Sequence, residues 1–261
     1  GKSGTGLFAQ SGGTSRIGDL YLGYNSGNGT YSLSGTAELL MSSMGSQYVG
    51  YSGTGTFTHS GGTNYVYQLN ISSGSGSTGT YNLSDTGQLN AQALQVGSSS
   101  AGSAATFTQS GGTNGSTYVF VGGSNATYNL TGGQLQAQSE SMRSGTGTFN
   151  QSGGSNNTDN LRLGQYSGDN ATYTLSGNGQ LNVAHGEYVG AVPNATAFFQ
   201  QTGGINRTEY LFIGNGGRCQ LNNGTLQVSN GFSIQGVFDA SGNTFVLGGK
   251  DRILDFTQGT F

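Results

Sequence analysis

The sequence contains very little proline, cysteine and charge. Of its 261 residues, one is proline, one is cysteine, none is tryptophan, and charged residues make up 7%. A collagen-like helix and a proline-rich linker both require proline, so neither fits. The lone cysteine, Cys219, excludes a disulfide framework within the chain. We expect Cys219 to act as a small buried apolar residue, with an intermolecular disulfide as the alternative.

The low charge also limits the classes of partner. Eight basic and 11 acidic residues give a net charge of −3, and Lys and Arg never cluster. Neither nucleic acid nor an anionic membrane surface is therefore an expected partner. No apolar run approaches the roughly 18 residues of a membrane-spanning helix, so membrane insertion is not expected. Glycine, by contrast, is abundant, with 51 residues.

One short phrase recurs along most of the chain: an aromatic residue, any residue, Gln or Leu, then Ser-Gly. The aromatic residues are spaced about 20 to 26 residues apart, and the phrase degrades at Cys219. A fixed period in this range indicates a stacked-repeat architecture, in which each unit buries its apolar face against its neighbours. The nine aromatic positions are Phe8, Tyr31, Phe57, Tyr81, Phe107, Tyr128, Phe149, Tyr173 and Phe199.

The pattern within each repeat predicts the fold class. Polar and apolar residues alternate with period two around each aromatic residue, which indicates short strands, and Gly-rich phrases mark corners. We therefore predict an all-β protein, a right-handed parallel β-helix (β-solenoid) of about 10 coils of 20–26 residues. A propeller blade has a similar length to two coils, but four alternating strands per module are not visible. A sandwich would not repeat one phrase.

Two kinds of coil alternate along the chain. Coils with Phe carry Gln two residues later, whereas coils with Tyr carry Leu there, so the sequence module is two coils of roughly 42 to 50 residues. The nine aromatic residues should stack as a core column. Strand parity points the Gln side chain inward, where we expect it to bond to corner backbone groups. The residues at this position are Gln10, Gln109, Gln151 and Gln201, with His59 in one coil.

The repeats define two regions. Residues 1–228 are predicted to form the solenoid, and the chain starts in repeat phase, so we expect a processed protein or a fragment of a longer one. In residues 229–261 the phrase fades while charge and bulky apolar residues increase. This segment is predicted to form C-terminal capping coils or a subunit interface, since a solenoid has to cover its last edge.

A column of threonine is predicted on the outside of the rod. The residue before the aromatic is Thr in seven successive coils, and parity makes it face outward. Stacked Thr and Asn can simply stabilise parallel coils. The alternative is a flat binding face for a regular partner, such as another solenoid, a polysaccharide or ice. The seven residues are Thr30, Thr56, Thr80, Thr106, Thr127, Thr148 and Thr172.

Asn-x-Ser/Thr triplets are frequent and are possible glycan acceptors if the chain is exported. The abundance of Asn, Ser and Thr is the alternative explanation for these triplets. The candidate acceptors are Asn28, Asn70, Asn114, Asn125, Asn156, Asn170, Asn194, Asn206 and Asn223.

The sequence offers no clear site for catalysis. Acidic residues occur at about one per coil or fewer and at shifting positions, whereas solenoid lyases and hydrolases need them clustered. His185 and Glu187 are expected to form a surface pair, and His59 to fill a Gln slot. Neither histidine has partners at metal-ligand spacing. We therefore predict that the protein is not an enzyme and has no catalytic, cofactor-binding or metal-binding residues.

The repeated phrases resemble the autotransporter-type β-helical passenger repeats of bacterial surface proteins, over about residues 4 to 228. The resemblance implies export and a structural, adhesive or matrix role at the cell surface. The leading hypothesis is an extracellular structural protein, a subunit of a filament, matrix or surface layer that self-associates through solenoid ends. Its expected partner is a second copy of the chain, in a head-to-tail or lateral homopolymer. The alternative is an adhesin, or a module that binds a glycan or ice through the outward Thr/Asn face.

Overall fold

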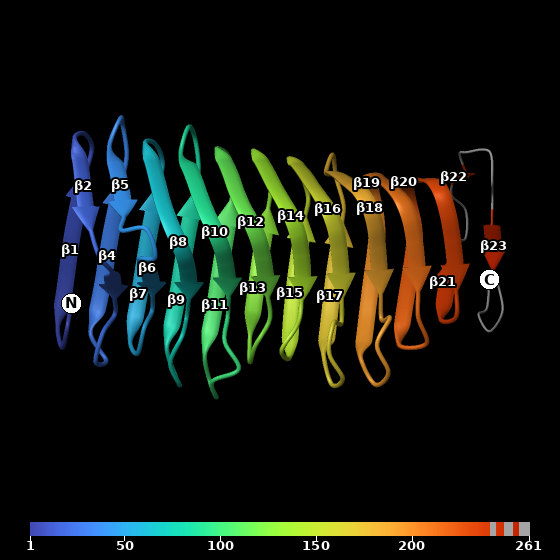
Figure 1. The fold of residues 1–261 in the computed structure, drawn as a ribbon, viewed down its shortest axis with the longest axis horizontal. Helices are drawn as coiled ribbons and strands as arrows, with labels where there is room; N and C mark the ends of the chain where they lie inside the picture. The colour runs from blue at the N-terminus through green and yellow to red at the C-terminus, as the bar shows by residue number, and fades with distance from the viewer. Residues whose placement is uncertain (241–243, 248–252, 256–261) are drawn as a thin grey trace.

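A computed structural model describes residues 1–240, 244–247 and 253–255. The described residues form no helix but a single 23-stranded parallel sheet, wound into a β-solenoid of about ten coils. The coils stack into a rod with β1 at one end and β23 at the other (Figure 1). The predicted fold class is thus confirmed, while the right-handed sense of the winding stays a prediction.

Each coil begins with a strand that carries the aromatic residue of the repeat. The first strands of successive coils pair in parallel without a register shift from β1 to β17. They are β1 (Thr5–Gln10), β4 (Asn28–Leu33), β7 (Thr54–His59), β9 (Thr78–Leu83), β11 (Ala104–Gln109), β13 (Ala126–Leu130), β15 (Thr146–Gln151) and β17 (Asn170–Leu175).

The rest of each coil returns to the start of the next one. In the first two coils the return consists of two strands, and in later coils it is one longer strand that bends in its middle. These strands are β2 (Thr14–Ile17), β3 (Leu20–Leu22), β5 (Glu38–Met41), β6 (Ser46–Val49), β8 (Thr63–Ile71), β10 (Gln88–Val96), β12 (Thr113–Val121), β14 (Gln134–Met142), β16 (Ser155–Leu163) and β18 (Gln180–Val189).

Near the C-terminus, single strands extend through whole coils. β19 (Thr196–Ile213) and β20 (Gly217–Ile234) pair along most of their length, and β20 then pairs with β21 (Val237–Asp239), β22 (Thr244–Leu247) and β23 (Ile253–Asp255). The predicted boundary at residue 228 therefore falls inside a continuous strand. The predicted capping or interface segment, residues 229–261, lies partly outside the described residues.

The register stacks the nine predicted rings in one column. Phe57 lies opposite Tyr31 on one side and Tyr81 on the other, with ring centroids 5.0 and 4.7 Å away. From Tyr31 to Phe199 the rings are within 20° of parallel. Such pairs add about 0.5 to 1.5 kcal/mol each beyond burial. Cys219 takes the next position in the column and is buried.

Glycine turns the chain at a corner of each Phe coil, as the Gly-rich phrases predicted. Gly112, the second glycine of a Ser-Gly-Gly phrase, has φ +64°, and a Cβ there would lie 2.3 Å from the Gly87 carbonyl oxygen of the preceding coil. A side chain at this position would therefore suffer both backbone strain and a clash. The equivalent residues Gly13, Gly62, Gly154 and Gly204 also have positive φ.

Candidate functional site

Hydrogen bonds inside the rod explain why Phe coils and Tyr coils alternate. The Gln151 Nε2 group donates to the carbonyl oxygen atoms of Gly154 (3.4 Å) and Gln180 (2.9 Å), as predicted for the inward Gln. Gln151 Oε1 accepts a hydrogen bond of 2.6 Å from the Tyr173 hydroxyl group, which the sequence analysis did not predict. The Phe coil thus supplies an acceptor and the following Tyr coil supplies the donor.

The same arrangement recurs in other modules and fails where the repeat degrades. The Tyr31 hydroxyl donates to Gln10 Oε1 (2.6 Å), and the Tyr128 hydroxyl donates to Gln109 Oε1 (2.7 Å). Gln201 is followed by the coil in which Cys219 replaces the aromatic residue. Accordingly, Gln201 Oε1 is buried without a hydrogen-bond partner among the described residues.

His59 fills the Gln position of its coil, as predicted. Its Nε2 atom lies 3.1 Å from the Gly62 carbonyl oxygen, which can only accept, so Nε2 carries the proton. The other ring nitrogen, Nδ1, accepts from the Tyr81 hydroxyl group at 2.9 Å. Burial lowers the pKa of His59 to about 4, so the imidazole is neutral at pH 7.

A second inward column alternates Asn in Phe coils with Leu in Tyr coils. In register order it contains Asn64, Leu89, Asn114, Leu135, Asn156, Leu181 and Asn206. Asn156 Nδ2 donates to the Tyr173 hydroxyl (3.1 Å), and Asn114 Nδ2 to the Tyr128 hydroxyl (3.0 Å). Each of these buried phenols therefore both accepts from an Asn and donates to a Gln.

A third inward column runs through the second half of the return strands, where most coils have Leu or Val. Three Tyr coils carry a polar residue at this position instead. In each case an Asn of the next coil donates to its side-chain oxygen. The pairs are Gln47 with Asn64 (2.8 Å), Glu140 with Asn156 (3.0 Å) and Glu187 with Asn206 (2.9 Å). Glu140 is 1% exposed and Glu187 is fully buried.

The two buried carboxyl groups lie where acceptors outnumber donors. Glu140 Oε1 and Asn156 Oδ1 both lack a hydrogen-bond partner in the described part of the chain, and so do Glu187 Oε1 and Asn206 Oδ1. A proton on each carboxyl group would add the missing donor. Burial, partly offset by the Asn hydrogen bond, raises the pKa of both Glu140 and Glu187 to about 7.

The expected surface pair of His185 and Glu187 is wrong. A bulge in β18 leaves His185 exposed, while Glu187 points into the rod beside the core residues. Glu187 and Glu140 also share one register column, two coils apart, so the acidic residues are less scattered than the sequence analysis suggested. The bulge adds one residue between Val183 and Glu187, so that Glu187 takes the inward register position opposite Leu161 of the preceding coil.

The seven predicted threonines form one outward column. Each pairs with the next along β4, β7, β9, β11, β13, β15 and β17, and all seven side chains are half-buried. Leu7 precedes the column and Phe198 follows it. Beside it, Asn150 Nδ2 donates to Asn129 Oδ1 at 3.0 Å, and this hydrogen bond joins two coils on this face. A binding role for the face stays a prediction.

The predicted glycan acceptors divide into two groups. Asn114, Asn156 and Asn206 are buried and donate to groups in the core, so the folded chain leaves no room for a glycan on them. Glycosylation stays a prediction for the others, which are exposed or half-buried: Asn28, Asn70, Asn125, Asn170, Asn194 and Asn223.

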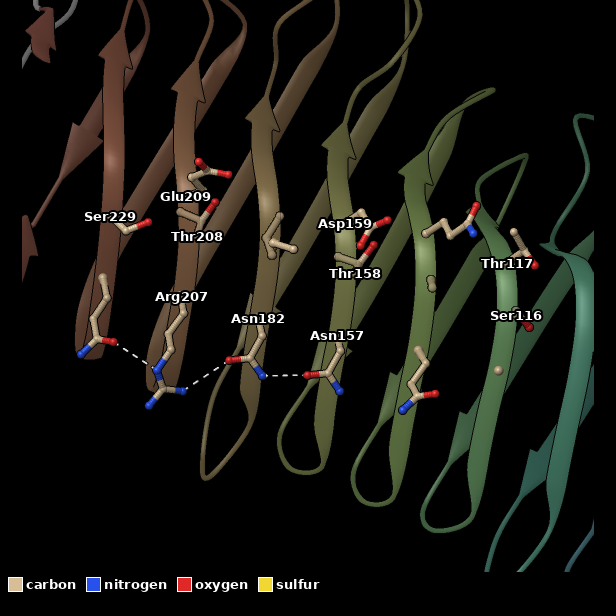
Figure 2. Close-up of a pocket in the computed structure, with 17 residues that line it drawn as sticks. Ser116, Thr117, Asn157, Thr158, Asp159, Asn182, Arg207, Thr208, Glu209 and Ser229 are labelled. Carbon is tan, nitrogen blue, oxygen red and sulfur yellow. Dashed lines mark hydrogen bonds between the residues drawn. The ribbon is translucent and has the colours of Figure 1, made fainter. Parts of the chain in front are cut away.

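The structure contains a groove that the sequence analysis missed. It lies along the rod over β12, β14, β16, β18, β19 and β20, with a volume of about 910 Å³, and its walls carry amide and hydroxyl side chains (Figure 2). The inward residues at the bend of these strands have small or β-branched side chains, and they line the groove. The residues at the bend are Ser116, Ala137, Thr158, Val183 and Thr208.

Aromatic residues are exposed at the N-terminal end of the rod. Tyr21 stacks on Tyr48 at 4.8 Å and Tyr24 stacks on Tyr51 at 5.3 Å, and the two pairs meet edge to face. Sequence spacing alone placed none of these four residues at the surface or together. Because they belong to the third strand and its following corner, only the coil geometry brings them into contact.

In the described part of the chain, no group of three or more His, Cys, Asp or Glu side chains could hold a metal ion. Cys219 is buried and free, and burial raises the pKa of its thiol. Among the described residues, no helix has the length and apolarity to cross a membrane.

No protein-family model, curated protein or solved structure matches the chain. The resemblance to autotransporter-type passenger repeats therefore rests on the repeated phrases alone, whereas the β-solenoid itself is observed.

Proposed function

We propose that the protein is an extracellular structural rod, a subunit of a filament, matrix or surface layer, that self-associates through its β1 end. The repeat phrases that resemble bacterial surface proteins support the location. About ten hydrogen-bonded coils around a continuous ring column form a stiff element, which suits a structural role.

The observation that carries the proposal is the exposure of the first ring of the column, in β1. Phe8 is 52% exposed and its outward neighbour Leu7 is 76% exposed. Beside them lies an apolar hollow of about 340 Å³ lined by core residues of the first two coils, including Leu22 and Leu39. In the described part of the chain, β1 pairs with β4 alone, so one edge of β1 offers its backbone groups to another strand.

The two ends of the column differ. Phe238, which continues the ring register beyond Cys219, is 1% exposed, in contrast to Phe8. Among the described residues of the ring column, Phe8 is therefore much more exposed than Phe238, which favours a contact between two β1 ends. A contact between two β1 ends joins only two rods, so growth into a filament, layer or matrix requires further lateral contacts between the paired rods.

Sedimentation equilibrium and electron microscopy of the purified chain test this proposal. We expect association that increases with concentration and is abolished by Leu7→Lys combined with Phe8→Ser. The matched control is Val237→Lys, in the same outward column at the far end of the rod. Wild-type protein that sediments as a 26.6 kDa monomer at every concentration, or variants that associate as well as wild type, would refute it.

A binding role for the Thr face is the second candidate, favoured by the unbroken pairing of the seven threonines. Replacing Thr30, Thr80 and Thr127 with Tyr should abolish binding to ice or to a crystalline polysaccharide while the fold persists, since all three side chains point outward. Unchanged binding by this variant would eliminate the face.

A further inference from the structure

The groove over β12 to β20 has the dimensions of a site for an extended polymer. Six coils line it at about 4.8 Å per coil, so its outer coils are about 24 Å apart. Its volume of about 910 Å³ lies in the usual range for ligand sites. The groove is parallel to the rod axis, and successive coils present equivalent positions along it (Figure 2).

One wall of the groove is a fixed row of planar polar groups. Asn182 Nδ2 donates to Asn157 Oδ1 (3.0 Å), and Arg207 donates to Asn182 Oδ1 (3.4 Å) and to Gln227 Oε1 (3.1 Å) (Figure 2). These bonds orient the amides and the guanidinium before any ligand arrives, which lowers the entropy lost on binding. Planar groups of this kind form paired hydrogen bonds with neighbouring hydroxyl groups.

The charges in the groove favour an uncharged ligand. The positive Arg207 is accompanied by two carboxylates, Asp159 and Glu209, which line the opposite side. A net negative site repels acidic polysaccharides and nucleic acids. An extended peptide is also disfavoured, because the backbone groups of these coils already pair with the coils on both sides, leaving no strand edge to extend.

Exposed aromatic residues continue the line of the groove. Tyr65 on β8 occupies the register column that passes through Asn90 to Gly115 in the groove wall. Tyr65 is 47% exposed and Tyr67, two positions further, is 48% exposed. An exposed tyrosine ring offers an apolar face together with a polar hydroxyl, which suits the apolar face of a sugar ring and its hydroxyl edge.

We propose that this groove binds a linear, uncharged polysaccharide lying along the rod axis, with the amide row forming hydrogen bonds to its hydroxyl groups and Tyr65 stacking on one sugar ring. The proposal is independent of self-association through β1. It also differs from binding by the Thr face, because the groove lies on the return strands and not on the first strands of the coils.

Isothermal titration of the full chain tests the proposal with four probes: the hexasaccharides of cellulose, xylan, mannan and chitin. At least one should bind, and its disaccharide should bind about tenfold more weakly or worse, because fewer coils are engaged. Binding by none of the four, or equal affinity for the disaccharide, overturns the proposal. Tighter binding of hexagalacturonate than of every neutral probe overturns the choice of an uncharged ligand.

Two matched double variants localise the site. Asn157→Ala with Asn182→Ala removes the amide–amide hydrogen bond of 3.0 Å in the groove, together with the hydrogen bond that Asn182 Oδ1 accepts from Arg207. Asn129→Ala with Asn150→Ala removes an amide–amide hydrogen bond of 3.0 Å on the Thr face. We expect the groove variant to weaken binding about tenfold or more and the face variant to leave it unchanged. Equal effects of the two variants, at equal thermal stability, overturn the assignment to the groove.

Discussion

The buried carboxyl groups Glu140 and Glu187 should make the rod less stable as the pH rises. In the folded chain the pKa of each is about 7, against 4.5 for the exposed side chain. Between these values the folded state retains protons that the unfolded state has lost. The stabilisation by protonation is therefore fully present below about pH 4.5 and is lost as the pH rises through about 7.

The size of the effect follows from the pKa change. A difference of about 2.5 units corresponds to about 3 kcal/mol for each glutamate at pH values well above 7. His59 acts in the opposite direction, because its folded pKa of about 4 lies below the 6.5 of an exposed imidazole. Its contribution is lost as the pH falls from about 6.5 towards 4, so the wild-type profile contains both effects.

Substitution by glutamine separates the two effects. Gln47 already occupies the equivalent position and accepts the same Asn hydrogen bond. Hence Glu140→Gln and Glu187→Gln should preserve the fold. We expect guanidinium unfolding to give each variant a free energy of unfolding about 3 kcal/mol above that of wild type at about pH 9. At about pH 5 the difference should be small.

The control is Asp85→Asn, which replaces an exposed acid. It should change the free energy of unfolding little at either pH. A Glu140→Gln difference that is the same at both pH values would show that the carboxyl group does not exchange its proton on unfolding, and the reasoning would fail.

Three further predictions concern the core and the corners. His59→Gln restores the repeat residue and should raise stability by about 2 kcal/mol at about pH 5 but little at pH 8, measured by denaturant unfolding. Tyr173→Phe leaves Gln151 Oε1 without its donor and should lower the free energy of unfolding by about 1 to 3 kcal/mol. An unchanged unfolding midpoint would show that this hydrogen bond does not stabilise the fold. Gly112→Ala should destabilise by more than about 1 kcal/mol, while Gly12→Ala, in open space without positive φ, should not; equal thermal midpoints would contradict this.

The sequence alone was sufficient for the fold because one phrase recurs in phase with the coil. Phe57 and its neighbours predicted the ring column, and the alternation of Gln and Leu predicted the two-coil module. The alternation of Asn64 with Leu89 was equally visible in the sequence and would have revealed the second column. It was missed because Asn was interpreted only as an outward or glycosylated residue.

The groove and the buried acids could not be predicted because they depend on local changes of strand parity. At the bend two successive residues, such as Thr117 and Tyr118, avoid the core, whereas in β18 three residues separate the inward Val183 from the inward Glu187. Period-two reasoning assigns faces correctly only between such interruptions. The depth of the groove also depends on the bend, which small residues permit but do not by themselves dictate.

The donor and acceptor halves of the module impose a parity rule on the length of the rod. Inserting two coils keeps every glutamine next to a phenol, whereas inserting one would place two Phe coils or two Tyr coils side by side and leave an amide or a phenol in the interior without this partner. Gln201 already shows that defect once. Longer or shorter relatives, natural or engineered, should therefore differ from this chain by even numbers of coils.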